Sequence, residues 1–235
     1  MLNLNCDLGE GAGDDELILA LVDSASVCCG AHAGSAGLAV ATACRCRELG
    51  VEVGAHPGYP DRAGRGREEI GLSIAEVESL LRAQVGLLAG AGPISYVKPH
   101  GALYHRCQED PEAAAVLARV ASEWGLGLIG QPGSEIIGAA RRAGLAAYRE
   151  GFADRGYTEH RGLVPRSEPG ALLGPGGAAL QAVRLARSGA LDTICLHGDS
   201  PGAAEVARAV RRALDGAGVV TGPLRPGARG AGSHI

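Results

Sequence analysis

Residues that can carry charge or transfer protons follow a short apolar stretch, Ile94–Val97, near the middle of the chain. They are Lys98 and His100, with His105 a little further on, and Lys98 is the only lysine among 22 Lys and Arg residues. An ammonium group is a compact charge whose pKa the surroundings can tune, whereas a guanidinium group stays charged. We therefore interpret Lys98 as the centre of a functional site rather than as a surface residue.

The same pattern, an apolar stretch followed by charged or proton-transferring side chains, recurs along the whole sequence. Most of the seven histidines follow such a stretch. Histidine and carboxylate side chains serve as general acids, general bases and hydrogen-bond partners. We expect these residues to form one metal-free pocket. They are Asp7, His32, His56, His100, Glu150, Asp154, His197 and Asp199.

A divalent metal ion is an alternative for part of this set. Imidazole and carboxylate groups suit zinc, manganese or iron, so Asp7, His32 and His56 could act as ligands. The sequence contains neither an HExxH nor an HxH motif that would strengthen this interpretation. We therefore expect no tightly bound metal.

Neighbouring residues offer partners for two of the carboxylates. Arg155 follows Asp154 and would keep its carboxyl ionised, which fits either a structural pair or a catalytic base. His197 lies two positions before Asp199 and could orient it. The other candidates for contact with a substrate are Asn5, Glu10 and Glu150.

Short apolar stretches alternate with stretches of helical character along the chain. The pattern predicts strands at 2–8, 26–29, 51–54, 94–97, 127–130, 145–150 and 192–196. It predicts helices at 14–22, 36–49, 73–88, 111–124, 135–142, 177–188 and 201–215. Strands that alternate with helices form a parallel sheet with right-handed crossover connections.

The positions of the polar residues indicate the type of sheet. They follow the carboxyl ends of the strands, which in a parallel barrel share one face, where active sites form. A doubly wound open sheet would collect them at a single switch point and leave several apart. We therefore predict an α/β fold, a single-domain TIM-like (β/α)7 barrel over residues 1–221. Residues 222–235, rich in Gly, Pro and Arg, are predicted to be a disordered tail.

The composition excludes several classes of function. With 46% hydrophobic and 3% aromatic residues, the chain can form a sizeable core of Ala, Val, Leu and Ile side chains. A net charge of -4 and a pI near 6.0 leave no basic surface for nucleic acid or a membrane. The sequence has no Walker A motif, and no GxGxxG follows a strand and opens a helix.

The first residues and the cysteines predict a cytoplasmic protein. The chain begins without the pattern of a signal peptide and has no apolar run of about 20 residues that could span a bilayer. Its seven cysteines form no CxxC pair and are expected to be reduced. We expect Cys6, Cys28, Cys29 and Cys195 to be buried in strands, and Cys44 and Cys46 to pack along a helix.

Several phrases at the predicted strand ends resemble the LamB/YcsF family. They are Asn5–Glu10, Cys29–Gly34, Gly54–Asp61, Val97–Tyr104, Phe152–Arg155 with Tyr157, Pro165–Ser167 with Pro169–Ala171, and His197–Asp199. Each of these motifs alone is weak evidence for the family, but all of them occur in the order and spacing of the family. The resemblance extends to about residue 215.

The resemblance implies a seven-stranded, TIM-like barrel of the glycoside hydrolase/deacetylase type. It also implies the ATP-dependent hydrolytic opening of 5-oxo-L-proline (pyroglutamate), a lactam, to L-glutamate, with release of ADP and phosphate. ATP would be the co-substrate, together with Mg²⁺. The partners would be subunits B and C of 5-oxoprolinase.

This reaction suggests roles for individual residues. Lys98 would neutralise the charge of a phosphate group or an oxyanion. His56, His100 or Asp199 would activate water or protonate the ring nitrogen, and Asp7 completes the set of predicted catalytic residues. The residues predicted to bind substrate are Asn5, Glu10, His32, Tyr104, Glu150, Asp154, Arg155 and His197.

The sequence departs from the usual residues of the family at three positions. Ser26 and Ser200 stand where Asn is usual, and Ser35 stands where Asp is usual. Two alternatives to the lactam hydrolase remain. One is a metal-dependent deacetylase of an N-acyl sugar that uses the metal ligands named above. The other is a non-catalytic lactam-binding subunit, which the departure at Ser35 favours.

Overall fold

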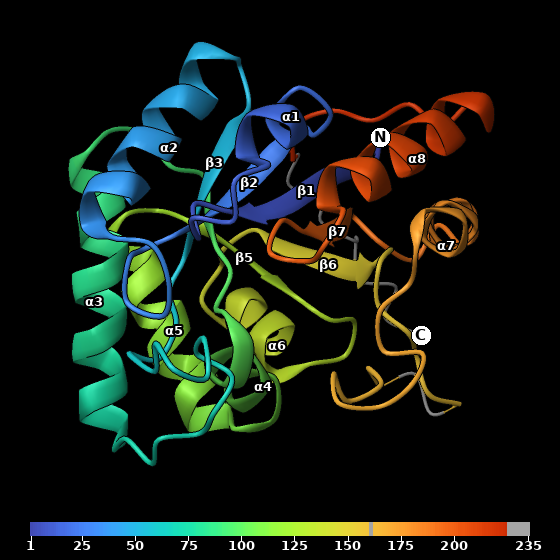
Figure 1. Ribbon diagram of the computed structural model, residues 1–235. Helices are drawn as coiled ribbons and strands as arrows, with labels where there is room; N and C mark the ends of the chain where they lie inside the picture. The colour runs from blue at the N-terminus through green and yellow to red at the C-terminus, as the bar shows by residue number, and fades with distance from the viewer. Residues whose placement is uncertain (160–161, 225–235) are drawn as a thin grey trace.

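The computed structural model of the protein describes residues 1–159 and 162–224. In these residues parallel strands form a closed barrel, and helices surround it, with α2 and α3 on one side and α7 and α8 on the other (Figure 1). The strands are β1 (Asn3–Leu8), β2 (Ser24–Cys28), β3 (Glu52–His56), β4 (Tyr96–Val97), β5 (Gly127–Gly130), β6 (Ala147–Phe152) and β7 (Thr193–His197). The helices are α1 (Asp15–Leu19), α2 (Ala36–Glu48), α3 (Ile74–Gly90), α4 (Gly101–Glu109), α5 (Pro111–Glu123), α6 (Glu135–Arg142), α7 (Pro175–Arg187) and α8 (Ala203–Gly216).

The barrel closes between its first and last strands. β1 pairs in parallel with both β2 and β7, and the register places Asp7 opposite His197. Each remaining strand pairs with the next one along the chain. The predicted closed barrel is therefore confirmed, and the open-sheet alternative is wrong.

The segment after β4 differs from the prediction. Helix α4 begins at Gly101, in a stretch where the sequence predicted no helix. Gly101 has a φ of 55°, and His100 before it is extended, so the chain turns sharply into the helix. Asp110 ends α4 and caps α5 by accepting a hydrogen bond from the Glu112 backbone N–H, with Pro111 at the first position of α5.

Strand β6 lies two residues later in the chain than predicted. Its register pairs Glu150 with Thr193 and Phe152 with Cys195, so Glu150 lies inside the strand rather than at its carboxyl end. The packed chain also continues beyond residue 221. The Gly222 backbone N–H donates to the Leu2 carbonyl at 2.9 Å. The rest of the predicted tail, 225–235, lies outside the described residues.

The interior of the barrel contains short polar side chains below the site. Asn3 Oδ1 accepts hydrogen bonds from Ser24 Oγ at 2.9 Å and Thr193 Oγ1 at 2.7 Å. Asn5 donates to the same threonine hydroxyl at 2.7 Å and is fully buried. Because its amide is used inside the barrel, Asn5 does not line the pocket, although it was predicted to bind substrate. Ser26 contacts the Tyr96 hydroxyl at 3.2 Å.

The departure from the family at Ser35 keeps a local structural role. Ser35 is the N-cap of α2, and its hydroxyl accepts a hydrogen bond from the Leu38 backbone N–H at 3.1 Å. Aspartate and serine are about equally good N-cap residues. The replacement therefore preserves the start of α2.

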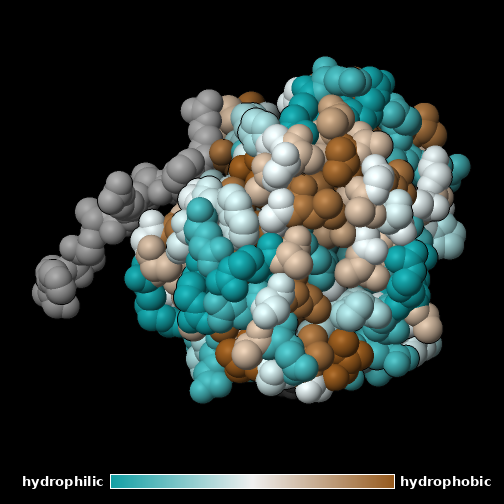
Figure 2. Space-filling view, turned by 90° about the vertical axis from the view of Figure 1, so that its left-hand side faces the viewer, coloured by the Kyte–Doolittle hydropathy of each residue, from teal (hydrophilic) through white to brown (hydrophobic). Residues whose placement is uncertain are grey.

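The outer surface mixes charged and apolar residues. On the face shown in Figure 2, apolar side chains are scattered among hydrophilic ones. No helix of the described chain combines the length and apolar composition needed to cross a bilayer. All seven cysteines lie in the described part of the chain and are free thiols. Cys46 packs in the core as predicted, but the expectation for Cys44 is wrong because it points outward from the same helix and is exposed.

Candidate active site

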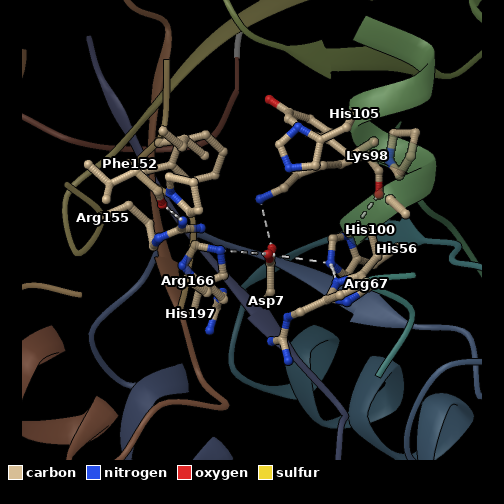
Figure 3. Close-up of a pocket in the computed structure, with 17 residues that line it drawn as sticks. Asp7, His56, Arg67, Lys98, His100, His105, Phe152, Arg155, Arg166 and His197 are labelled. Carbon is tan, nitrogen blue, oxygen red and sulfur yellow. Dashed lines mark hydrogen bonds and ion pairs between the residues drawn. The ribbon is translucent and has the colours of Figure 1, made fainter. Parts of the chain in front are cut away.

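A pocket of about 360 Å³ opens at the carboxyl ends of the strands, on the face that the sequence predicts. Its lining residues come from nearly the whole length of the chain, between Asp7 and His197. Figure 3 shows Asp7 at the centre, with Lys98, His56 and His197 directed toward it. The predicted site residues that line the pocket are Asp7, His56, Lys98, His100, Tyr104, Arg155 and His197.

The carboxylate of Asp7 is the centre of the site. Its Oδ1 accepts a hydrogen bond from Lys98 Nζ at 2.8 Å. Its Oδ2 lies 3.3 Å from His56 Nε2 and 3.9 Å from His197 Nε2. Burial by itself would raise the pKa of Asp7, but its interactions with these three groups hold the pKa well below its usual range. A carboxylate this acidic balances positive charge better than it accepts protons.

Lys98 is buried among anionic and polarisable groups. Its Nζ lies 3.1 Å from Glu150 Oε2 and 3.0 Å from Cys195 Sγ, in addition to the bond to Asp7. Although burial disfavours the charge, Asp7 and its other neighbours raise the pKa of Lys98 well above its ordinary value. Lys98 is therefore an ammonium ion on the floor of the pocket, as the sequence analysis expected. Its Nζ lies 5.6 Å from the centroid of the Phe152 ring.

Glu150 contacts Lys98 from inside the barrel. It is 1% exposed and does not line the pocket described above. Burial raises the pKa of Glu150, an effect that the nearby ammonium group of Lys98 opposes. Glu150 thus holds Lys98 in place, whereas the sequence analysis expected it to contact substrate.

His197 and Asp154 form an oriented pair. Asp154 accepts hydrogen bonds at 3.0 Å from His197 Nδ1 and from the backbone N–H of His197. Because a carboxylate only accepts, Nδ1 carries the proton and Nε2 faces Asp7 and the pocket. The ring of His197 also stacks on Phe152, with centroids 5.6 Å apart. A histidine fixed in one orientation by a buried carboxylate is suited to transfer protons.

The predicted pairing of Asp154 with Arg155 is wrong. The Arg155 guanidinium instead donates to the backbone carbonyls of Ala171 at 3.0 Å and Val164 at 2.7 Å. Consecutive residues of an extended segment point to opposite sides, so neighbours in sequence seldom form a pair there. Arg155 therefore holds the loop that closes one side of the pocket.

The predicted orientation of Asp199 by His197 is also wrong. Asp199 forms an ion pair with Arg67 and lies 3.5 Å from Arg65 and 3.8 Å from Arg166. Burial would raise the pKa of Asp199, but the arginines and His197 lower it below its ordinary value. Asp199 therefore anchors arginines at the rim, and its carboxylate does not line the pocket.

Three histidines and Glu10 form a compact cluster beside Asp7. The rings of His32 and His100 are parallel with centroids 3.9 Å apart, and His56 stands edge-on to His100. Burial lowers the pKa of His56 to about 4 and that of His100 well below its usual value. For His32, burial is outweighed by Cys28 and Glu10, which raise its pKa to about 9.

Two glycines provide the space for the stacked rings. A Cβ atom at Gly58 would lie 2.5 Å from His32 Nδ1, and one at Gly66 would lie 2.7 Å from His32 Cβ and 3.0 Å from His100 Cδ2. Gly66 also has a φ of 71°, which disfavours any residue with a side chain. The Gly- and Arg-rich loop after β3 is therefore required to form the cluster.

The metal ligands considered in the sequence analysis do not come together as one set. Among the described residues, His32 and His56 group with Glu10 and His100, whereas Asp7 groups with Cys195 and His197. Glu10 Oε1 lies 3.6 Å from His32 Nε2, and Glu10 Oε2 lies 2.7 Å from Arg65. Although burial opposes ionisation, His32 lowers the pKa of Glu10.

Several residues of the pocket were missed by the sequence analysis. Arg67 and Arg166 both line it and bring positive charge to its rim, and Phe152 lines one side. His105, which was noted in the sequence without a role, also lines the pocket. Arg166 belongs to a phrase that resembles the family, which was a usable signal. Arg67 lies in a Gly- and Arg-rich loop for which the sequence predicted no function.

The fold and the site define a class, the closed parallel α/β barrels with a polar pocket at the carboxyl ends of the strands. Within this class, the chain belongs to the LamB/YcsF family, which it matches over residues 2–228. The A subunit of 5-oxoprolinase from Chloroflexus aggregans is 42% identical over 243 residues, which cover 93% of this chain and 96% of that relative. The predicted family is therefore confirmed.

Solved structures show the same fold. The lactam utilization protein from Thermus thermophilus matches with a TM-score of 0.85 and 39% sequence identity, over 94% of this chain and 98% of that one. The family 4 carbohydrate esterase from Streptomyces lividans matches with a TM-score of 0.55 and 15% identity, over 96% and 93% of the two chains. The second likeness concerns the fold alone, and it agrees with the predicted deacetylase-type barrel.

Proposed function

We propose that this chain is part of a lactam hydrolase that opens 5-oxo-L-proline to L-glutamate, driven by the hydrolysis of ATP. The observation that carries the proposal is a pocket in which a buried ammonium group, a carboxylate and an oriented imidazole meet. The pocket occurs in a chain that is 42% identical to a protein named as the A subunit of 5-oxoprolinase. ATP with Mg²⁺ is the proposed co-substrate.

The reaction needs activation because a lactam is a stable amide. Transfer of the γ-phosphoryl group of ATP to the ring oxygen releases ADP and gives an activated imidate. Water then adds to the ring carbon, and the C–N bond breaks as the nitrogen takes up a proton. A second water hydrolyses the resulting acyl phosphate. One lactam, one ATP and two waters thus give one glutamate, one ADP and one phosphate.

The residues on the pocket floor fit the charges that develop in these steps. Lys98 is a fixed cation, and a preorganised cation stabilises a developing oxyanion or phosphoryl group. His197 presents Nε2 to the pocket and is held by Asp154, so it is the proposed general acid and base. This assigns the main proton transfer to His197, which the sequence analysis placed among the substrate-binding residues.

The rim fits the anionic parts of the reactants. Arg67 and Arg166 line the pocket, and guanidinium groups bind carboxylates and phosphates through paired hydrogen bonds. We assign them to the carboxylate of 5-oxo-L-proline or to the phosphate groups of ATP. Neutral amides without a carboxylate would then be poor substrates.

The proposal includes partner subunits and a location. The relative from Chloroflexus aggregans is named as one lettered subunit of 5-oxoprolinase, which refers to an assembly. We propose subunits B and C of 5-oxoprolinase as the partners of this chain. Without a basic surface, the chain is not assigned to nucleic acid or a membrane, and we propose that it acts in the cytoplasm.

The test is glutamate release from 5-oxo-L-proline and ATP by this chain co-purified with subunits B and C. We expect glutamate and ADP in equal amounts, and no product when any one component is left out. Lys98→Met, which removes the charge and keeps the length, should lower kcat by at least about 100-fold. Arg82→Met, on the outer face of α3, is the matched control and should leave kcat unchanged.

Two results would overturn the proposal. Glutamate release that persists in the Lys98→Met complex would place the chemistry elsewhere. No release by an assembled wild-type complex that still binds the lactam would instead indicate the non-catalytic binding subunit.

A further inference from the structure

In the cluster beside Asp7, the hydrogen bonds of two neutral histidine rings leave two nitrogen lone pairs facing each other. His56 Nδ1 lies 2.7 Å from the Lys98 carbonyl oxygen, and His100 Nε2 lies 2.9 Å from the Arg65 carbonyl oxygen. A carbonyl oxygen only accepts hydrogen bonds, so both of these nitrogens carry protons. In the neutral rings, His56 Nε2 and His100 Nδ1 are then both lone pairs, yet they face each other at 2.9 Å.

Two lone pairs this close require a positive centre between or beside them. A single shared proton would satisfy these two nitrogens and Asp7 Oδ2, which lies 3.3 Å from His56 Nε2, but it would not reach His32 or Glu10. His32 Nε2 points into the same space, has no hydrogen-bond partner among the described residues, and belongs to a side chain that is 1% exposed. Glu10 Oε1 lies 3.6 Å from this nitrogen and 3.9 Å from His100 Nδ1. A cation would satisfy all four groups together.

The spacing of these donors fits a common ion. One ligand atom from each of the four residues lies within 4.8 Å of the others. Donor atoms bound to one ion at about 2.1 Å lie roughly 3.0 to 3.4 Å from one another. The distances of 2.9, 3.6 and 3.9 Å bracket this range. Because the rings of His32 and His100 are parallel, one of them must rotate before both lone pairs point at the same ion.

The hydrogen bonds that the cluster residues make to groups outside the cluster are also typical of a metal site. A histidine that binds a metal usually donates its other ring N–H to a carbonyl or carboxylate, which fixes the ring. His56 and His100 each do so with a backbone carbonyl. The second carboxylate oxygen of Glu10 is held by Arg65 at 2.7 Å. Gly58 and Gly66 leave room for the rings and for nothing larger.

We propose that Glu10, His32, His56 and His100 form a binding site for one divalent transition-metal ion. Three imidazoles and one carboxylate match the preferences of Zn²⁺ best, and those of Fe²⁺ or Mn²⁺ next. Mg²⁺ prefers oxygen ligands and retains water, so it does not fit this set. The proposal replaces our expectation of no tightly bound metal. It concerns binding alone and does not rest on the proposed function.

The test measures metal binding to the full chain without lactam or ATP. The protein is treated with a strong chelator, and Zn²⁺ is then titrated by isothermal calorimetry, with Mg²⁺ in a parallel titration. We expect one Zn²⁺ per chain, a melting temperature that rises with Zn²⁺, and no saturable binding of Mg²⁺. His32→Ala and His56→Ala should each weaken Zn²⁺ binding by at least about 100-fold.

His105→Ala is the matched control. His105 lines the same pocket but does not belong to the cluster, so its removal should leave Zn²⁺ affinity unchanged. Glu10→Gln tests the carboxylate with little change in shape. Should an alanine variant fail to fold, Co²⁺ bound to the wild-type chain reports the ligands through its visible absorption, which Zn²⁺ should displace.

Two outcomes would overturn the proposal. One is the absence of saturable binding of Zn²⁺, Mn²⁺ or Co²⁺ to the chelator-treated, folded wild-type chain, with ¹⁵N resonances that show a proton shared by two histidines. The other is Zn²⁺ binding that is lost in His105→Ala but retained in His32→Ala. Because no turnover is measured, neither outcome depends on whether the chain hydrolyses a lactam.

Discussion

The chain holds two networks of charged residues that use the same chemical groups in opposite surroundings. At the mouth of the barrel, Lys98 joins Asp7 and Glu150, and all three side chains are almost fully buried. On the outer surface, Arg82 of α3 lies 2.6 Å from Glu123 of α5, and both remain in contact with water. The distances are similar, and only the surroundings differ.

The difference in burial indicates that the two networks have different roles: the buried one serves chemistry, and the exposed one is part of an ordinary charged surface. Removing charges from water is costly, and their mutual attraction inside a protein seldom does more than offset that cost. An exposed pair is easy to form and contributes little. A fold that gathers two carboxylates from β1 and β6 and an ammonium group from the residue after β4 therefore retains them for a purpose other than stability.

The largest effect should follow from removing the buried ammonium. Lys98→Met leaves Asp7 and Glu150 without their cation, and breaking a buried pair costs about 3–5 kcal/mol. This is a large part of the roughly 5–15 kcal/mol that is typical of a folded protein. The measurement is urea denaturation of both proteins, followed by circular dichroism.

Asp7→Asn with Lys98→Met provides the second half of this test. The double variant removes two charges of the network, so it should be more stable than Lys98→Met alone. A double variant that loses the sum of the two single effects would mean that Asp7 and Lys98 do not interact.

A smaller effect, on activity rather than stability, is expected for Asp154→Asn. The amide still occupies the place of the carboxylate, but it no longer holds His197 Nδ1 as a charged acceptor. We expect kcat for glutamate release to fall roughly 10- to 100-fold with little change in KM, less than the full contribution of a general acid and base. Asp192→Asn, on the same pair of strands at the opposite end of the barrel, is the control and should retain kcat. A higher KM with unchanged kcat would assign Asp154 to binding.

Asp199, at the rim of the pocket, should make the stability of the protein depend on pH. Its folded-state pKa is below that of the unfolded chain, because the arginines outweigh the effect of burial. The stability that it contributes is therefore complete above the unfolded value of about 3.9 and is lost as pH falls through the lowered, folded-state value. The difference in unfolding free energy between wild type and Asp199→Asn should shrink as the solution is acidified below about pH 4. A difference that stays constant down to low pH would contradict this origin.

Much of this architecture could be predicted from the sequence because barrel strands carry their functional residues at one end. The strand ends, the closed barrel and the central place of Lys98 follow from a local pattern in the chain. The residues with which these side chains pair could not be predicted in the same way. Asp154 pairs with His197 across two strands, and Asp199 pairs with Arg67 across the pocket, so neither contact is local in sequence.

The histidine cluster also could not be predicted from the sequence. Its residues are separate in the chain and match no metal motif, and their contacts depend on the loop that carries Gly58 and Gly66. Helix α4 was missed for a related reason. Pro99 and Gly101 resemble a loop locally, and the positive φ of Gly101 turns the chain into a helix only within the folded barrel.

The smallest effect is expected on the outer surface, at Glu78. Hydrogen bonds from Arg119 and Arg82 lower the pKa of Glu78 to about 2, yet all three side chains remain in contact with water. Glu78→Gln should change the melting temperature far less than Lys98→Met does, and added salt should remove the change because it screens exposed charges. The effect of Lys98→Met should persist in the same salt, because salt screens a buried pair much less than an exposed one. Melting curves of the three proteins in low and high salt test both statements. A Glu78→Gln effect that is large and independent of salt would show that burial does not account for the difference between the two networks.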